Sequence, residues 1–398
     1  MKKVPDPADA SRRQMLKLGV GAIAGIAGVP RLANAAPTLP QTMVFTCHST
    51  GSGNIIATVL ADAVQKKEPT TKIRVTPASN GVGLVLPLKT GRADYTFAAN
   101  ELFFASEAAY EFGTRDWGGP QELRIVLAPP KALGLASAKD ANIFTPADLK
   151  GKRLAYVKGS PSVNVKMDAY LAFAGLTRKD VEVVWLSNSA RGSKDALLNN
   201  QADAVTYTTN SPAMKEVELS PRGLRWVEFP PEDKQGWARM QAIMPVISPR
   251  RDTQGEAMSP THPVNIMGWR YPQIACYASK NADEVYAFIK VLDESFDLYK
   301  SAHPDMGSLK ISEAGRTPAD VPFHDGAIRY LKEKGVWTAA DQAWQDARVE
   351  RIRTVRRSWD KATGEFGKWL QTKRAQTPNL DESEAWNEFW ASHQGIKE

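Results

Sequence analysis

The sequence of 398 residues predicts an α/β fold built from two units. In the first part of the chain, short β-type runs alternate with helix-like runs, which indicates right-handed βαβ crossovers and mostly parallel sheet. The same alternation starts again after residue 140. A strand-like stretch and a strong helix after residue 268 indicate that the chain returns to the first unit. We therefore expect two crossings between the units, near Ala136–Phe144 and Met267–Cys276.

The first 35 residues are typical of an export signal. Ser11–Lys17 resembles the twin-arginine export consensus, with Met15 where Phe is commonest. The uncharged run Leu18–Val29 is too short to span a bilayer, and Ala33–Ala35 has the small-x-small pattern of a signal-peptidase site. We expect cleavage after Ala35 and a mature chain in the periplasm of a bacterium. No later segment is long and apolar enough for a membrane span.

The charge of the chain argues against nucleic-acid binding. The net charge is +7, and the first 35 residues contribute +4 of it through six basic and two acidic groups. The +3 that remains on the mature chain is too small to indicate a polyanion-binding surface.

The first unit is expected to span residues 36–139 and 268–340. Each of its early strands leads into a helix-like run, such as the one that begins near Asn54 with apolar residues on one face. The expected strands are Thr42–Thr46, Lys72–Pro77, Asp94–Asn100 and Leu123–Pro129.

The second unit is expected to span residues 140–267. Thr145 and Pro146 have the pattern of an N-cap followed by Pro at the first helical position, and Gly151 ends that short helix. A helix over Val163–Ala174 follows. The expected strands are Arg153–Val157, Val181–Leu186 and Asp203–Thr209.

Residues 341–398 are predicted to form a helical C-terminal extension. This segment carries five tryptophans, and residues 348–374 hold nine basic and three acidic side chains. We interpret it as helices packed through an aromatic face with a solvated basic side. A docking surface on the basic side is the alternative.

The sequence lacks the usual signatures of redox, metal or nucleotide sites. There is no CxxC or CxxCH pattern, and the five histidines are scattered without metal-ligand spacing. Both glycine-rich loops have an apolar residue where a dinucleotide-binding GxGxxG motif needs its third glycine. No cofactor and no metal is expected. Cys47 and Cys276 are expected to be two buried free thiols, with a disulfide as the alternative.

Three loops follow strands and open helices: His48–Asn54, Ala78–Gly83 and Lys158–Asn164. In open α/β sheets, ligands collect outside the carboxyl ends of strands, where free backbone N–H groups favour an anion. We therefore expect an anionic ligand between these loops, bound by backbone N–H groups and by the hydroxyls of Ser52, Ser160 and Ser162. A side chain at Gly53 would block the approach.

The order of several short motifs resembles the periplasmic receptors of tripartite ATP-independent (TRAP) transporters, in their TAXI family. The residues that carry the resemblance are Thr50-Gly51-Ser52-Gly53, Ser79-Asn80-Gly81 with Ala93-Asp94, Asp148-Leu149 with Gly151-Lys152, Gly159-Ser160 with Ser162, Leu186-Ser187 with Asp203-Ala204, and Ala282–Leu292. It covers roughly residues 42–335. The sequence departs from the family pattern at Ile55-Ile56-Ala57, at Ala99-Asn100-Glu101 and in its longer C-terminal tail.

The resemblance implies a two-lobed, type II-like periplasmic solute-binding protein fold with a ligand cleft between the lobes. It implies a receptor, not an enzyme, that captures a small carboxylate-bearing solute, an organic acid or an amino-acid-like ligand, and delivers it to separate TRAP permease subunits in the membrane. The ligand-binding residues expected on this basis are Ser49, Thr50, Gly51, Ser52, Gly53, Asn54, Ser79, Asn80, Gly81, Asn100, Glu101, Gly159, Ser160, Ser162, Tyr207, Asn210 and Arg270. For Arg270, in the returning segment, two roles stay open: a surface ion pair, or a bidentate clamp on the anion.

Two other functions stay open at this point. One is a periplasmic dehydratase or lyase on the same fold, with His48 and Glu101 as the candidate acid–base pair. The other is a receptor that serves another transporter class or a sensor.

Overall fold

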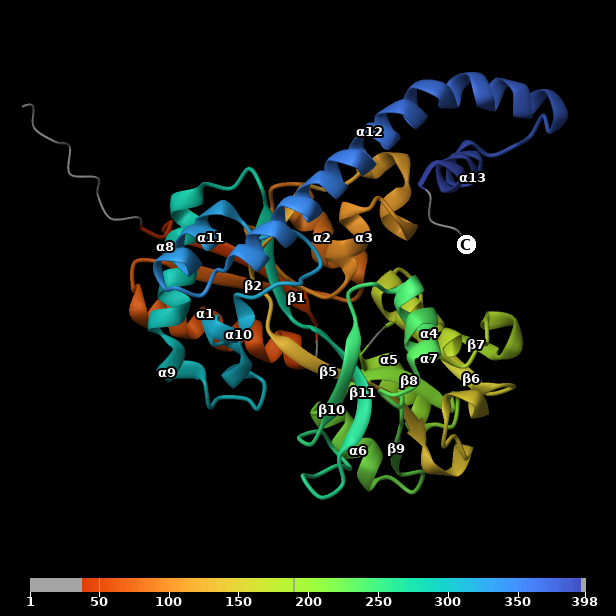
Figure 1. The fold of residues 1–398 in the computed structure, drawn as a ribbon, viewed down its shortest axis with the longest axis horizontal. Helices are drawn as coiled ribbons and strands as arrows, with labels where there is room; N and C mark the ends of the chain where they lie inside the picture. Colours follow the sequence, from red (N-terminus) through yellow and green to blue (C-terminus); the bar gives the residue numbers. More distant parts are fainter. Residues whose placement is uncertain (1–37, 50, 189, 395–398) are drawn as a thin grey trace, which may run out of the picture. The chain divides into compact units, whose positions relative to one another are not determined.

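The computed structural model describes residues 38–49, 51–188 and 190–394, which form two β-sheets with helices around them (Figure 1). Each sheet carries its own helices and defines one lobe. The predicted α/β class with two lobes and a helical C-terminal extension is therefore confirmed. The predicted export signal and its cleavage site lie outside the described residues.

The sheet of lobe 1 has the strand order β2-β1-β3-β12-β4. Strands β1, β2 and β3 are parallel and each is followed by a helix, as in βαβ crossovers, and β12 runs antiparallel between β3 and β4. The elements are β1 (Thr42–His48), α1 (Ser52–Lys67), β2 (Lys72–Ala78), α2 (Gly81–Lys89), β3 (Tyr95–Ala98), α3 (Glu101–Ser106), β4 (Leu123–Leu127) and β12 (Gln273–Tyr277).

Four later helices belong to lobe 1. The ring of Phe288 lies 4.3 Å from that of Tyr95 and 5.6 Å from that of Phe45, measured between ring centres. This contact between α8 and the sheet explains why the returning helix is strongly amphipathic. The helices are α8 (Ala282–Glu294), α9 (Phe296–Tyr299), α10 (Ile311–Ala314) and α11 (Asp325–Glu333).

The sheet of lobe 2 has the order β10-β11-β5-β8-β6-β7, with β9 paired to β5. Its strands are β5 (Pro130–Ala138), β6 (Arg153–Val157), β7 (Glu182–Leu186), β8 (Ala204–Thr208), β9 (Leu224–Val227), β10 (Ser248–Asp252) and β11 (Val264–Arg270). Its helices are α4 (Pro161–Phe173), α5 (Ala190–Leu198), α6 (Pro212–Leu219) and α7 (Lys234–Ile243).

Short 3-10 segments complete the two lobes. They are η2 (Tyr110–Gly113), η3 (Arg115–Trp117), η4 (Lys139–Ala141), η5 (Pro146–Leu149), η6 (Arg178–Asp180) and η7 (Met306–Leu309). The predicted cap at Thr145 is present as a capping box with Asp148.

The crossings between the sheets differ partly from the expected positions. β5 already belongs to the second sheet, so the first crossing lies between β4 and β5, before the expected 136–144. The sequence pattern did not reveal β5 as a strand, because its alanine, serine and glycine residues are not β-branched. The second crossing lies at Tyr271–Pro272, within the expected range. Proline there separates β11 from β12, because it has no N–H for a sheet ladder.

The C-terminal extension consists of α12 (Ala339–Gln376) and α13 (Glu382–Gln394). The indole N–H groups of Trp386 and Trp390 donate to the carbonyls of Gly113 and Ala108, at 2.8 and 2.7 Å. These two tryptophans share a separate apolar cluster with residues of α12, among them Trp359 and Phe366. The interpretation of helices packed through an aromatic face is thus confirmed.

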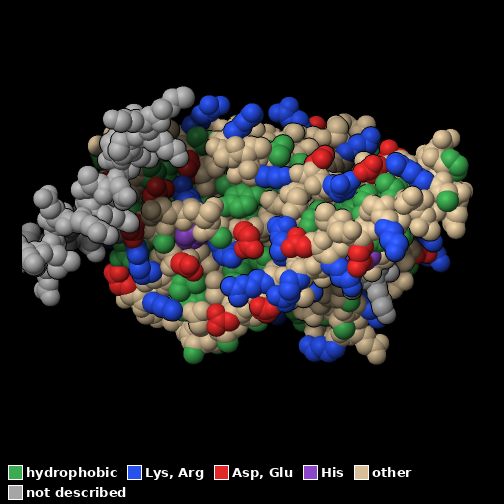
Figure 2. Space-filling model, turned by 90° about the horizontal axis from the view of Figure 1, so that it is seen from above, with side chains coloured by type: hydrophobic (Ala, Val, Ile, Leu, Met, Phe, Trp, Pro, Cys, Tyr) green, Lys and Arg blue, Asp and Glu red, His purple; other side chains and the backbone are tan. Residues whose placement is uncertain are grey.

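The outer side of α12 carries mixed charge. Arg353 and Arg357 both lie near Glu350, at 3.8 and 2.8 Å. Figure 2, which looks onto the molecule from above the view of Figure 1, shows basic side chains interspersed with acidic and hydrophobic ones. The structure therefore adds nothing in favour of a docking surface on this side.

Cys47 and Cys276 are both buried and free, as expected. Among the described residues, no helix is long and apolar enough to cross a membrane.

Candidate ligand-binding site

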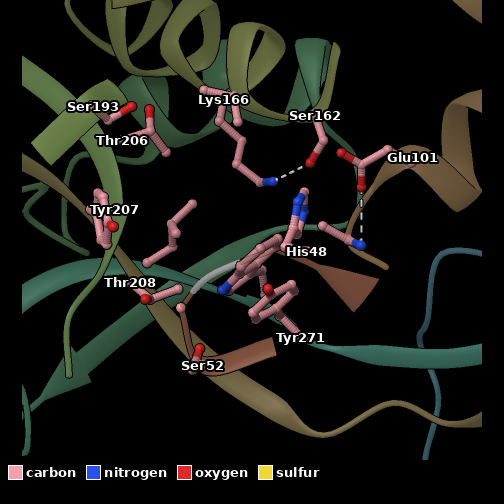
Figure 3. Close-up of a pocket in the computed structure, with 15 residues that line it drawn as sticks. His48, Ser52, Glu101, Ser162, Lys166, Ser193, Thr206, Tyr207, Thr208 and Tyr271 are labelled. Atoms are coloured by element: carbon pink, nitrogen blue, oxygen red, sulfur yellow. Dashed lines mark hydrogen bonds between the residues drawn. The ribbon is translucent and has the colours of Figure 1, made fainter. Parts of the chain in front are cut away.

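A pocket of about 90 Å³ lies where the strand-to-helix loops of the two lobes meet, and its walls come from both sheets (Figure 3). Residues of β1, α1 and α3 contribute from lobe 1, and residues of α4, β8 and β11 contribute from lobe 2. The lining residues are His48, Gly51, Ser52, Ala99, Glu101, Leu133, Ser162, Val163, Lys166, Ser193, Thr206, Tyr207, Thr208, Trp269 and Tyr271.

Lys166 supplies a buried cation to this pocket. Its side chain is only 2% exposed, and its Nζ donates to the hydroxyl of Ser162 at 2.7 Å. The two residues are four apart in α4, so they share one face of that helix. Burial lowers the pKa of Lys166 to about 7, against the raising effect of the nearby charges of Glu101 and Asp320.

Glu101 supplies a buried carboxyl group from the other lobe. It is 1% exposed, and its Oε2 accepts from the backbone N–H of Ala99 at 3.0 Å. A Cβ placed on Gly81 would lie 2.5 Å from the Cγ and Oε1 of Glu101. Glycine at position 81 therefore leaves the space that this carboxyl group occupies.

Two parallel aromatic rings form one wall. Trp269 and Tyr271 stack with ring centres 4.8 Å apart and an angle of 5° between their planes. Two further polar groups of the pocket have no hydrogen-bond partner in the described part of the chain: the indole Nε1 of Trp269 and the hydroxyl of Thr206. Because such groups are costly to bury unpaired, they point to a bound polar ligand.

His48 lies at the end of β1 and faces the same space (Figure 3). Burial lowers its pKa below the ordinary value, with Glu101 acting in the opposite direction. The ring is therefore neutral at pH 7, and it can donate one hydrogen bond and accept another.

A second buried lysine lies beside the pocket. The Nζ of Lys131 donates to the hydroxyl of Ser52 at 2.8 Å and pairs with Asp305, which also accepts from the side-chain amide of Asn210. Burial is the largest influence on the pKa of Lys131 and lowers it, against the raising effect of Asp305. Because Asp305 follows α9 in lobe 1 while Asn210 follows β8 in lobe 2, this cluster joins the two lobes.

Five of the predicted site residues line the pocket: Gly51, Ser52, Glu101, Ser162 and Tyr207. Thr50 lies outside the described residues. The backbone N–H of Gly81 donates to Ser160 Oγ at 3.4 Å, and that of Val82 donates to the Gly159 carbonyl at 3.4 Å. Two of the three predicted loops thus meet each other across the cleft.

The other predicted residues near these loops have local roles. Asn80 caps α2 by accepting from Gly83 N–H at 2.9 Å, and Asn54 donates to the His48 carbonyl at 3.2 Å. Asn100 donates to Asp320 at 2.8 Å.

Two expectations about the loops differ from the structure. A Cβ on Gly53 would collide with the hydroxyl of Tyr271, so the group that closely approaches this glycine is the Tyr271 side chain. Ser49 and Ser79 do not line the pocket.

The structure does not place Arg270 at the pocket. Its guanidinium group donates to the backbone carbonyls of Ala128, Glu313 and Pro318, at 2.6 to 3.0 Å. Side chains alternate along a strand, so a position between Trp269 and Tyr271 faces the opposite side of the sheet. The expected clamp on the anion is therefore replaced by a link between backbone segments.

The sequence interpretation missed Lys166, Trp269, Tyr271 and Thr206. The signal for Lys166 was its spacing of four from Ser162, which on a helix beginning at Pro161 puts both side chains on one face. The signal for the aromatic pair was the alternation around Arg270. Within residues 38–49, 51–188 and 190–394, no group of three or more His, Cys, Asp or Glu side chains could hold a metal ion.

Comparison with known proteins gives relatives among solute-binding proteins. A curated protein named "Putative aliphatic sulfonates-binding protein" from Escherichia coli (strain K12) is 28% identical over 177 residues, which is 44% of this chain and 51% of that protein. The chain thus spans about half the length of this curated relative.

Two solved structures show weaker similarity. The alkanesulfonate-binding protein SsuA from Xanthomonas axonopodis pv. citri bound to MOPS is 19% identical with a TM-score of 0.45, covering 80% of this chain and 94% of that one. The periplasmic aliphatic sulphonate binding protein SsuA from Escherichia coli is also 19% identical, with a TM-score of 0.44 and coverages of 80% and 88%.

The strongest assignment comes from a family model. The model described as the NMT1-like family matches residues 46–335, which include every residue that lines the pocket and both sheets except the first four residues of β1. This match covers well over half of the sequence. The chain belongs to the NMT1-like family.

Proposed function

We propose that this protein is an exported solute-binding protein that captures a small anionic ligand and delivers it to the membrane subunits of a transporter. The observation that carries the proposal is the buried ammonium group of Lys166, which faces a pocket between two lobes. Such a pocket, with a few placed polar groups and walls from two lobes, is suited to closure around a ligand.

The donors in the pocket favour an anion. The Nζ of Lys166 has a hydroxyl and an aromatic ring as its partners in the described part of the chain, and no carboxylate lies within 4 Å of it. The unpartnered N–H of Trp269 and hydroxyl of Thr206 add further donors. Charge-assisted hydrogen bonds from such groups contribute about 1.5–3 kcal/mol each. The ligand oxygens then come from a carboxylate or a sulfonate.

One observation supports a transporter class, and another supports a ligand class. The order of short motifs supports a TAXI-type receptor of a TRAP transporter, with separate permease subunits as partners. The name of the Escherichia coli relative, an aliphatic sulfonates-binding protein, supports a sulfonate ligand. We propose the TRAP assignment for the partner and keep both anions as ligand classes. Genes for TRAP permease subunits beside this one would support it, and genes for an ATP-driven permease would contradict it.

A thermal-shift screen of small carboxylates and sulfonates against the mature protein tests the ligand class. A ligand at about 100 times its dissociation constant stabilises by ~2.7 kcal/mol. Lys166→Met should abolish the shift for every anion that stabilises the parent. Lys158→Met is the matched control, because Lys158 is exposed on the loop that leads into the same helix. Stabilisation by neutral or cationic compounds alone would sink the anion assignment.

An enzymatic activity is the second candidate, and a specific contact favours it. A lysine with a lowered pKa whose Nζ lies 2.7 Å from a serine hydroxyl is the arrangement of a Ser–Lys nucleophile pair, in which the neutral amine accepts the hydroxyl proton. His48 and Glu101 could supply acid–base groups for a dehydratase or lyase. Incubation of the best ligand with pure protein separates the functions: recovery of unchanged ligand supports a receptor, and conversion of the ligand supports an enzyme.

A further inference from the structure

One arginine of the C-terminal extension is linked to both ends of α3, the short helix that carries Glu101 into the pocket. We infer that Arg348 is a positioning residue for the pocket, because it holds α3, and with it Glu101, in place. This inference rests on the proposed function and adds to it a role for the extension. Arg348 lies outside residues 46–335, which match the family model.

Arg348 directly contacts the C-terminal end of α3, which α12 passes (Figure 1). Its Nη2 donates to the hydroxyl of Ser106, the last residue of α3, at 2.8 Å, and its guanidinium carbon lies 4.8 Å from the centre of the Phe103 ring. Its Nη1 donates to the carboxylate of Glu107, the residue that follows the helix. The side chain of Arg348 is 11% exposed, so solvent screens these contacts only weakly.

A second path links Arg348 to the N-terminal end of α3. Its Nε donates to the backbone carbonyl of Asp320 at 3.0 Å. The carboxyl group of Asp320 accepts from the side-chain amide of Asn100, the N-cap residue of α3, at 2.8 Å. The backbone N–H of Asp320 donates to Gln273 in β12 at 3.1 Å, which ties the path to the sheet of lobe 1. The two paths together form a closed ring of contacts around α3.

The position of α3 depends on such contacts. The helix has only six residues, Glu101–Ser106, and helices of this length are not stable on their own. Glu101 in its first turn lines the pocket, and so does Ala99 just before the helix. A displacement of α3 would therefore displace one wall of the pocket.

Arg356 attaches the same extension to lobe 1 without a link to α3. Its guanidinium group donates to the backbone carbonyls of Gly118 and Pro120, at 2.7 and 2.6 Å. In the described part of the chain it donates neither to α3 nor to Asp320. Arg356 is therefore the matched control, since its loss loosens the extension and leaves the ring of contacts intact.

Hydrogen exchange followed by mass spectrometry tests the positioning without a ligand. In Arg348→Ala, the amides of residues 102–107 should exchange at least about tenfold faster than in the parent, because α3 loses support at both ends. Asn100→Ala opens the same ring at the other end and should give the same pattern. Arg356→Ala should leave the exchange of this segment within about twofold of the parent.

Arg348→Lys provides a milder test, in case Arg348→Ala does not fold. The lysine keeps a positive charge opposite Glu107, but one ammonium group cannot replace the three directed contacts of a planar guanidinium group. The exchange of α3 should therefore still be faster than in the parent, while circular dichroism shows a folded protein.

Calorimetry with acetate and methanesulfonate as probes tests the consequence for the pocket. The probe that binds the parent more tightly should bind Arg348→Lys and Asn100→Ala at least about fivefold more weakly, because binding then has to order α3. Arg356→Ala should bind this probe within about twofold of the parent, since it lies away from the ring of contacts.

The outcomes separate this inference from the proposed function. Unchanged exchange of α3 in Arg348→Lys, or equally fast exchange in Arg356→Ala, would overturn the positioning role. Faster exchange with an unchanged affinity would also overturn it and leave an anion receptor. If neither probe binds the parent, the receptor for these anions fails, and the exchange of α3 alone then decides the role of Arg348.

Discussion

The ammonium group of Lys166 lies 3.9 Å from the centre of the Trp269 ring, and the two residues come from different elements, α4 and β11. A cation over an aromatic face gains about 0.5–2 kcal/mol, which is far below the desolvation cost of a buried ammonium group. The contact therefore holds the cation in place without neutralising it. An anionic ligand would complete its environment.

The stability of the ligand-free protein should depend on the charge of Lys166. Burial lowers its pKa in the folded chain from 10.5 to about 7, so between these values the unfolded chain binds more protons. The contribution of Lys166 to the free energy of unfolding is therefore lowest below pH 7, and it rises as the pH rises toward 10.5. We expect the melting temperature of the parent, relative to that of Lys166→Met, to increase between pH 7 and 9.

Lys166→Met serves as the reference because other groups of the protein also titrate near pH 7 to 9. Burial raises the pKa of Cys276 to about 12 and that of Cys47 above its ordinary value, and both thiols are present in the parent and in the variant. Asp320, with a pKa raised to about 7, acts below this range. A difference in melting temperature that stays flat or falls from pH 7 to 9 would contradict a buried, titrating Lys166.

Replacement of Arg270 should affect stability and not ligand binding. Arg270→Ala removes the donors of three backbone carbonyls, and we expect a loss of about 2–4 kcal/mol in the free energy of unfolding. Urea denaturation measures this loss. Calorimetry with the best ligand should give a dissociation constant within about twofold of the parent value. A tenfold weaker affinity would indicate that Arg270 contacts the ligand.

Removal of the charge on Asp305 should strongly destabilise the protein. Asp305→Asn leaves Lys131 buried without an anionic partner, and such a change costs about 3–5 kcal/mol. The double variant Lys131→Met with Asp305→Leu should recover much of this loss, because no unpaired charge remains. Urea denaturation of both variants makes the comparison. Similar stabilities of the single and the double variant would show that the unpaired charge of Lys131 is not the cause of the destabilisation.

The two arginines that bind Glu107 should contribute unequally to the attachment of the C-terminal extension. The side chain of Arg348 is 11% exposed and that of Arg351 is 46% exposed, while Glu107 is buried. Arg348→Ala should cost about 2–4 kcal/mol, and Arg351→Ala should cost less than about 1 kcal/mol because solvent screens its pair. Urea denaturation measures both, and equal losses would contradict the role of burial.

Export should depend on the twin arginines. Joint replacement of Arg12 and Arg13 by lysine should hold the precursor in the cytoplasm, whereas the parent should yield a periplasmic protein that begins at Ala36. Cell fractionation and mass spectrometry of the periplasmic product test both points. Normal export of the double variant would remove the basis for the twin-arginine route.

The sequence by itself determined the elements and their class. The alternation of strand and helix patterns gave the parallel core of both sheets, and the tryptophans after residue 341 gave a helical extension with an aromatic core. These signals are local, because hydrophobic period, capping residues and prolines act within a few residues of the chain. The loops Gly51–Ser52 and Ser160–Ser162 were found in the same way.

The tertiary structure alone decided which side chains meet in the pocket. Glu101 and Lys166 are 65 positions apart and come from different lobes, so no local pattern could show that each lacks a partner of opposite charge. The direction of Arg270 depended on which face of β11 turns to the cleft, and this was fixed by the antiparallel pairing of β11 with β5. Burial then set the charges, since desolvation acts only after the lobes have packed. Local residue patterns thus determined the secondary structure, and the packing of the two lobes determined the electrostatics of the site.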